Sequence, residues 1–138
     1  MPEIPNQPII LVAESDQEDR LLLEAELGKS GLEVAVYFVG TWQELMDYIY
    51  WRGNFSPPTK APFPHLLFLD LYLPDADIME ILSVLKRDPA FREIPVVLMV
   101  SSLVEGEYLQ ARSNFDFLDV VVKPITAERL HSLLELRS

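Results

Sequence analysis

The apolar residues of this chain gather in five short runs, each bounded by polar residues. β-branched and aromatic residues are frequent in them, and short runs of this kind are typical of buried strands. We therefore predict strands over residues 9–13, 33–39, 66–71, 94–100 and 117–122.

The segments between these runs carry apolar residues at helical spacing, with capping residues ahead of them. Two arrangements could cap the first helix, Ser15 with Glu18 or Asp16 with Asp19. Gly31 follows as a stop signal. The predicted helices cover residues 16–29, 41–53, 77–88, 103–112 and 126–136.

Strands and helices thus alternate along the whole chain. Apolar strands without polar alternation are typical of a parallel sheet that is covered on both faces. With right-handed crossovers, this order predicts an α/β fold with a doubly wound five-stranded parallel sheet and helices on both faces. No internal repeat is visible, and we expect residues 1–138 to form a single domain.

Composition narrows the possible partners. The formal charge is −11, from 22 acidic against 11 basic residues, which argues against direct binding to nucleic acid. The chain has no cysteine, so disulfides and thiolate metal sites are excluded. No apolar run is long enough to span a membrane and the N-terminus lacks a signal pattern, so we expect a cytoplasmic protein.

One segment does not fit the alternation. Residues 54–65 contain several prolines and no apolar period, and predict a long loop. This loop is either a partner surface or an insertion without function.

Polar residues follow four of the predicted strands. In a doubly wound sheet, ligands bind beyond the carboxyl ends of the strands, so these side chains should converge. A helix cap, a loop hydroxyl or a solvated lysine would explain most of them individually. The residues are Glu14, Ser15, Asp16, Asp70, Ser101, Ser102 and Lys123.

Asp70 is harder to explain as a structural residue. It lies within the apolar stretch LLFLDLYL. A carboxylate desolvated there is costly unless a cation or hydrogen-bond donors compensate. We therefore interpret Asp70 as a functional residue.

These strand ends together resemble the receiver domain of bacterial two-component response regulators. The matching segments are ILVAESDQED, LLFLDLYLPDADIME, IPVVLMVSS and DVVVKPIT. The segment LKRDPAFREIPVV is similar to the stand-alone regulators that accompany cyanobacterial phytochromes. The resemblance implies the flavodoxin-like strand order 2-1-3-4-5.

The resemblance also implies roles for individual residues. Asp70 matches the aspartate that accepts a phosphoryl group from a histidine kinase, and Lys123 matches the lysine that pairs with it. Ser101 matches the hydroxyl that reports phosphorylation. Glu14, Asp70 and the carbonyl of Tyr72 match the groups around a Mg²⁺ ion, whose preferred ligands are oxygens. The bond from Lys123 to Pro124 resembles one that is cis in the family.

The acid pair of the family is altered here. Ser15 stands where the second acid usually contacts the metal, and we expect it to weaken Mg²⁺ binding. Asp16 could reach the metal only if the loop adapts. We expect Ser15 to be a helix cap that stands where the family has a metal ligand.

Two further departures affect the switch. Ile78 replaces a glycine of the family, and a β-branched residue disfavours positive φ, so the backbone should run differently there. Val120 replaces the aromatic residue that moves with the reporting hydroxyl. We expect the usual read-out to be changed.

Three functions stay open. The first is a stand-alone receiver, without enzymatic or DNA-binding output, that signals by protein contact. Its partners would be a histidine kinase or phosphotransfer protein, and a second copy across the fourth helix, fifth strand and fifth helix. The second is a pseudo-receiver that binds without phosphorylation. The third, a flavodoxin-like cofactor binder, needs a donor-rich phosphate loop where this chain has SDQED.

Overall fold

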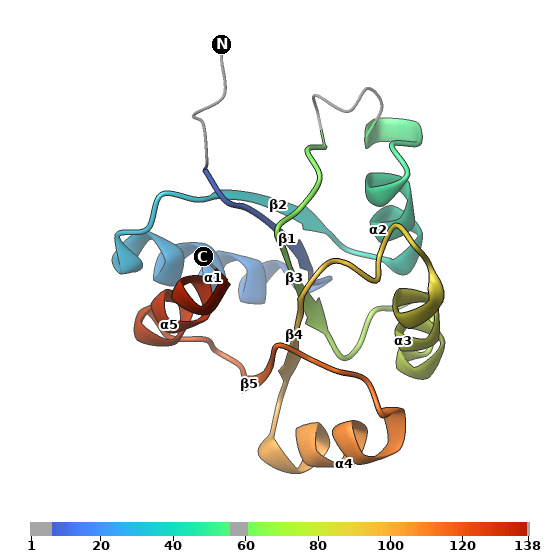
Figure 1. Ribbon diagram of the computed structural model, residues 1–138. Coiled ribbons are helices and arrows are strands. Elements are labelled where there is room, and N and C mark those ends of the chain that lie inside the picture. Colours follow the sequence, from blue (N-terminus) through green and yellow to red (C-terminus); the bar gives the residue numbers. More distant parts are fainter. Residues whose placement is uncertain (1–6, 56–60, 138) are drawn as a thin grey trace.

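The computed structural model describes residues 7–55 and 61–137, in which strands and helices alternate (Figure 1). The strands are β1 (Ile9–Ala13), β2 (Ala35–Val39), β3 (Leu66–Asp70), β4 (Val96–Val100) and β5 (Asp119–Val122). The helices are α1 (Gln17–Ser30), α2 (Trp42–Ile49), α3 (Ile78–Arg87), α4 (Leu103–Ser113) and α5 (Ala127–Arg137). A short 3₁₀ turn, η1 (Gly53–Phe55), follows α2.

The five strands form one parallel sheet in the order β2-β1-β3-β4-β5. Helices α1 and α5 lie together on one face, and α2 and α3 lie on the other (Figure 1). The predicted fold class and strand order are therefore confirmed. In this order β1 lies between β2 and β3, so the order in which strands are added to the sheet reverses between β1 and β3. Ligands bind at this point in such folds.

Alternate residues of each strand contribute to two separate hydrophobic clusters. In β1, Leu11 and Ala13 pack towards α2, α3 and α4, whereas Ile10 and Val12 pack towards α1 and α5. All five residues of β1, β3 and β4 are buried. This burial on both faces explains why these strands have no polar alternation.

Helix caps fix where several helices begin. Thr41 accepts the N–H of Glu44 at 3.0 Å and opens α2, as its sequence pattern predicts. Asp77 accepts the N–H of Met79 at 2.8 Å ahead of α3. Thr126 accepts the N–H of Arg129 at 3.2 Å at the start of α5. Gly31 ends α1 with a left-handed φ of 73°, which favours glycine.

The predicted loop over residues 54–65 lies partly outside the described residues. Its described end is fixed on α2 and on the turn after it, because the Tyr48 hydroxyl of α2 donates to the carbonyl of Pro62 at 2.6 Å and the Trp51 indole of the turn donates to the carbonyl of Ala61 at 2.7 Å. A role as a partner surface stays a prediction.

Candidate functional site

Glu14 follows β1 and begins the turn into α1. Its backbone N–H donates to the carbonyl of Val39 at 2.9 Å, and its own carbonyl accepts the Arg20 Nε at 2.6 Å. The side chain is only 2% exposed, and its Oε2 accepts the N–H of Asp16 at 3.1 Å. This backbone pairing directs the carboxylate into the edge of the sheet.

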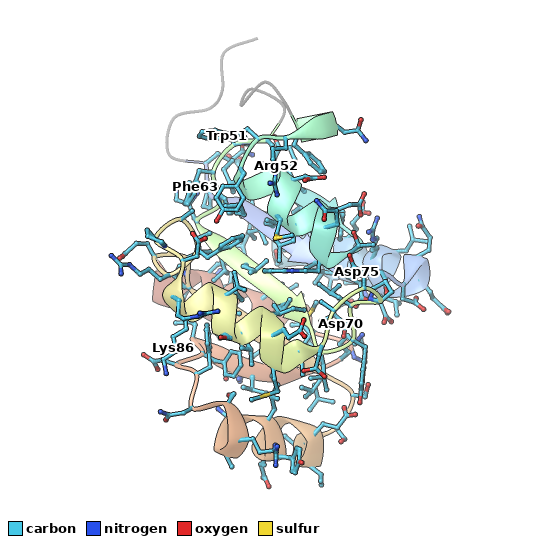
Figure 2. All side chains as sticks on the ribbon, turned by 90° about the vertical axis from the view of Figure 1, so that its right-hand side faces the viewer. Trp51, Arg52, Phe63, Asp70, Asp75 and Lys86 are labelled. Carbon is cyan, nitrogen blue, oxygen red and sulfur yellow. The ribbon has the colours of Figure 1, made fainter. Side chains whose placement is uncertain are left out.

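Asp70 is the last residue of β3, with β1 on one side and β4 on the other. Its side chain is 5% exposed, and the neighbouring strands bury it at their carboxyl ends. Asp70 and Glu14 are the two buried charged residues among those described. Figure 2 shows Asp70 on the same side of the molecule as Asp75, away from Trp51 and Phe63.

Lys123 brings the carboxylates together. It follows β5, where its backbone N–H donates to the carbonyl of Val100 at 2.8 Å. Its ammonium lies 3.0 Å from Glu14 Oε1, 2.8 Å from Asp19 Oδ2 and 3.3 Å from Asp70 Oδ1. The bond from Lys123 to Pro124 is cis, as the family resemblance predicts.

The electrostatics follow from three carboxyl groups that face one ammonium. Burial raises the pKa of Glu14, although the bonds from Asp16 and Lys123 partly oppose this shift. Burial also acts to lower the pKa of Lys123, but the hydrogen bonds to Asp19 and Glu14 and the charge of Asp70 outweigh it. The pKa of Lys123 is therefore raised, and the ammonium stays charged throughout the physiological range.

Ser15 and Asp16 are exposed, and neither contacts the Lys123 ammonium. Asp16 is the N-cap of α1, and its Oδ1 accepts the N–H of Asp19 at 2.9 Å. The predicted cap by Ser15 is therefore wrong, since Ser15 is an exposed residue of the turn ahead of the cap. A metal-binding role for Asp16 stays a prediction, and its exposed capping position argues against it.

Two serines follow β4, and their roles differ. The Ser102 hydroxyl caps α4, accepting the N–H of Glu105 at 3.3 Å. Ser101 is exposed, and its backbone N–H donates to Glu105 Oε1 at 2.9 Å. The Tyr72 hydroxyl donates to Glu105 Oε2 at 2.6 Å, so Glu105 connects the loop after β3 with the end of β4.

A second carboxylate of the loop after β3 is fixed by a helix. Asp75 accepts the backbone N–H groups of Trp42 at 2.6 Å and Gln43 at 3.0 Å, both at the start of α2. These are donors that the helix itself leaves unpaired. The loop that follows Asp70 is thus attached to the start of α2 through Asp75.

Ile78 and Val120, the two hydrophobic residues that differ from the family pattern, fit the local structure. Ile78 is the first residue of α3 and follows the cap, and it has no positive φ. Val120 is half-buried and packs beside α4, where a Cβ on Gly106 would lie 2.8 Å from its Cγ1. The valine and the glycine let α4 lie close to the sheet.

The sequence prediction placed most of these residues correctly at one edge of the sheet, but it missed Asp19. It treated Asp19 only as the partner of a helix cap. The available signal was its position in the first turn of α1, one turn after the strand end that carries Glu14.

Over the part of the chain that the structure describes, no group of three or more His, Cys, Asp or Glu side chains is arranged to hold a metal ion. The carboxylates face Lys123 instead. Within the same ranges, no helix has the length and hydropathy needed to cross a bilayer.

No protein-family model matches the chain. Among curated proteins, it is 28% identical over 101 residues to Response regulator Rcp1 of Synechocystis, which covers 73% of this chain and 67% of that protein. Similar solved structures include the bacteriophytochrome response regulator AtBRR, with a TM-score of 0.83 and 27% identity over 95% of this chain and 92% of that one.

Two cyanobacterial structures are also similar. The phosphorylated phytochrome response regulator RcpA has a TM-score of 0.72 and 26% identity, covering 94% of this chain and 89% of that one. The Mn²⁺-bound form of Rcp1 has a TM-score of 0.70 and 25% identity, and the match covers 94% of this chain and 88% of that one. The predicted similarity to phytochrome-associated regulators is thus confirmed, and it extends to bacteriophytochrome regulators. The sheet order, the strand-end residues and these relatives together show that the chain is similar to the response-regulator receiver domains of two-component signalling.

Proposed function

We propose that this receiver works as a stand-alone response regulator that accepts a phosphoryl group on Asp70 from a histidine kinase or a phosphotransfer protein. The observation that supports the proposal best is Asp70 itself, buried at the end of β3 with the Lys123 ammonium 3.3 Å away. The similar regulator RcpA has been crystallised in a phosphorylated form.

In the proposed step, an Asp70 carboxylate oxygen attacks the phosphorus of a phosphohistidine. An oxygen–phosphorus bond forms, the phosphorus–nitrogen bond breaks, and the imidazole nitrogen leaves with the bonding electron pair. Lys123 offsets negative charge on the phosphoryl oxygens, and the Ser101 hydroxyl supplies a further donor. Such a reaction depends on positioning and charge neutralisation more than on covalent help from the protein.

The donor set suits a hard divalent cation. The carboxylates of Glu14 and Asp70 and the carbonyl of Tyr72 are oxygen ligands of the kind that Mg²⁺ prefers. When bound, the ion would neutralise phosphoryl charge. We expect weak binding, because Ser15 is neutral and both oxygens of Glu14 already accept hydrogen bonds.

The proposed output is a protein contact, without enzymatic activity, in the cytoplasm. Leu103, Val104 and Tyr108 of α4 are exposed apolar or aromatic residues, and they make the face of α4, β5 and α5 the proposed surface for a partner or a second copy. Replacement of a family aromatic residue by Val120 changes how this face would report phosphorylation.

The alternative is a pseudo-receiver that binds its partner without phosphorylation. The observation that favours it is the engagement of Lys123 by Glu14 and Asp19, together with neutral Ser15 at the acid position. In this alternative, the ammonium permanently takes the place of a metal.

One experiment separates the two functions. We expect incubation with Mg²⁺ and acetyl phosphate to add one phosphoryl group to the intact protein, as seen by mass spectrometry. Asp70→Asn should abolish the adduct, because the amide cannot form an acyl phosphate. Asp119→Asn, which changes a strand acid at the start of β5, is the matched control and should keep it. Failure of the wild-type protein to form an adduct even at high Mg²⁺ would favour the pseudo-receiver.

A further inference from the structure

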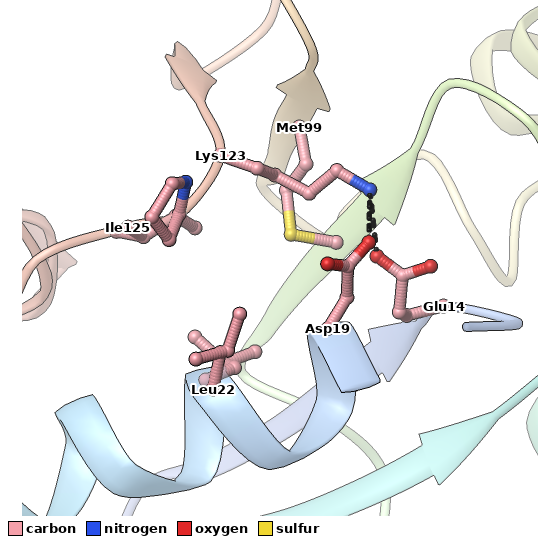
Figure 3. Close-up of a pocket in the computed structure, with 8 residues that line it drawn as sticks. Glu14, Asp19, Leu22, Met99, Lys123 and Ile125 are labelled. Carbon is pink, nitrogen blue, oxygen red and sulfur yellow. Dashed lines mark hydrogen bonds and ion pairs between the residues drawn. The ribbon is translucent and has the colours of Figure 1, made fainter. Parts of the chain in front are cut away.

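Asp19 is the closest partner of the Lys123 ammonium. The separation is 2.8 Å, compared with 3.0 Å to Glu14 and 3.3 Å to Asp70. Figure 3 shows the ammonium reaching from the end of β5 to Asp19, at the start of α1, and to Glu14. We propose that Asp19 is a positioning residue that orients the Lys123 ammonium towards Asp70.

The geometry accounts for all three N–H donors of the ammonium. A lysine ammonium has three donors and no acceptor, and here each donor has a carboxylate oxygen within 3.3 Å. Two contacts, to Glu14 and Asp19, hold the group from the side of β1 and α1. The third donor is thereby directed at Asp70 Oδ1.

Asp19 is well placed to hold this orientation. It lies in the first turn of α1, where its backbone N–H is fixed by the carboxylate of Asp16 at 2.9 Å. Its side chain is about one-third exposed and that of Lys123 is 18% exposed, so the pair is partly shielded from water. A charge-assisted hydrogen bond in such surroundings is stronger than one on an open surface.

Asp19 also supplies a negative charge to a site in which Ser15 replaces the second acid of the family pattern. Ser15 is neutral, so Glu14 and Asp70 would otherwise be the only carboxylates among the described residues that contact the ammonium. With Asp19 the cluster has three. The shortest contact of Lys123 is therefore to a residue outside the strand-end motif.

This assignment rests on the proposed function and adds a role within the same step. When an Asp70 oxygen bonds to phosphorus, the donor that faces Asp70 meets the incoming phosphoryl oxygens, while the other two stay on Glu14 and Asp19. Without Asp19, one of the two lateral contacts is lost and the ammonium can rotate away. Phosphoryl transfer should then be slower, because positioning is a large part of its catalysis.

The test compares Asp19→Asn with Glu18→Gln. Each variant removes one negative charge from the first turn of α1, but Glu18 is exposed and has no contact with Lys123 among the described residues. At saturating Mg²⁺, we expect Asp19→Asn to form the acetyl-phosphate adduct roughly tenfold more slowly, as befits loss of one charge-assisted contact. Glu18→Gln should react at the wild-type rate.

A Lys123→Met background shows whether Asp19 acts through the lysine. We expect Asp19→Asn to cause no further slowing in this background. Equal rates for Asp19→Asn and Glu18→Gln would overturn the inference, and so would an equal effect of Asp19→Asn with and without Lys123.

A second measurement does not depend on phosphorylation. In protein labelled with ¹⁵N-lysine, the ammonium signal that disappears in Lys123→Met reports its hydrogen exchange with water. We expect this exchange to be several-fold faster in Asp19→Asn and unchanged in Glu18→Gln; equal exchange rates would overturn the positioning role. A wild-type protein without an adduct would refute the proposed function, and the exchange rates would still decide the role of Asp19.

Discussion

At the residue scale, the turn after β1 separates three polar residues by direction. Glu14 is buried at the edge of the sheet, Asp16 caps α1, and Ser15 between them is exposed. Asp19, one turn later, returns to the cluster. A one-residue difference in position therefore decides whether an acid serves the site or the helix.

Restoring the missing acid should strengthen the metal site. We expect Ser15→Asp to raise Mg²⁺ affinity roughly tenfold, since loss of ligand support at metal sites commonly costs about that much or more. Isothermal titration calorimetry would measure it. Gln17→Glu adds the same charge at a nearby exposed position and should raise the affinity much less. Similar gains in both variants would show that the added charge acts only through the general field of the protein.

At the element scale, α4 lies close to the sheet at Gly106. Gly106 is buried within this helix, although glycine is a poor helix former. A Cβ there would meet Val120 Cγ1 at 2.8 Å and Val100 Cγ2 at 3.6 Å. The glycine is explained by this close approach, so the position of α4 depends on the side chains of β4 and β5.

Adding a methyl group at Gly106 should therefore be unfavourable. Alanine gains about 1 kcal/mol in helix propensity, but overpacking typically costs about 1–3 kcal/mol. We expect Gly106→Ala to lower the free energy of unfolding by about 1 kcal/mol, as measured by urea denaturation. Val120→Ala in the same chain should recover part of this loss. Gly28→Ala in α1, where a Cβ meets no atom within 4 Å, is the control and should stabilise the protein.

At the scale of the whole molecule, the alternation of apolar runs was sufficient to predict the architecture. The exact strand ends were harder to predict, because apolar residues continue beyond the paired segments. The predicted strands include residues 33–34, 94–95 and 117–118, but in the structure these residues precede β2, β4 and β5. Pairing depends on the neighbouring strand, which local sequence does not specify.

The site was predictable to a similar degree. Strand ends place Glu14, Asp70 and Lys123 at one edge, because parallel strands end together. The direction of each side chain depends on contacts that are distant in the sequence. The bond from Asp19 to Lys123 spans 104 residues and has no local signal.

The buried cluster should also affect the stability of the whole chain. Burial raises the pKa of Glu14 above its ordinary value of 4.5, so the folded chain holds this proton more tightly than the unfolded chain. The resulting stability is present below pH 4.5 and is lost as pH rises through the raised pKa. Glu14→Gln removes the titrating group. As pH rises from 4.5 through the raised pKa, the free energy of unfolding of this variant should therefore decline less than that of the wild type.

Urea unfolding at a series of pH values, with a chelator present, measures this difference. Asp19, Asp70 and Lys123 face Glu14 in both proteins, so their contribution remains in each curve. Glu18→Gln is the exposed control and should follow the wild type. Parallel curves for wild type and Glu14→Gln would contradict the expectation.

The attachment of Asp75 to the start of α2 has a consequence for motion. It joins the loop after β3 to α2 by two backbone donors, whereas Tyr72 in the same loop reaches α4 through a solvent-exposed hydrogen bond to half-buried Glu105. One end of the loop is therefore anchored and the other rests on a surface contact. A structural change at Asp70 should therefore reach α4 rather than α2. After phosphorylation of Asp70, we expect the amide hydrogen exchange of Ser101 and Glu105 to change and that of Trp42 and Gln43 to stay constant.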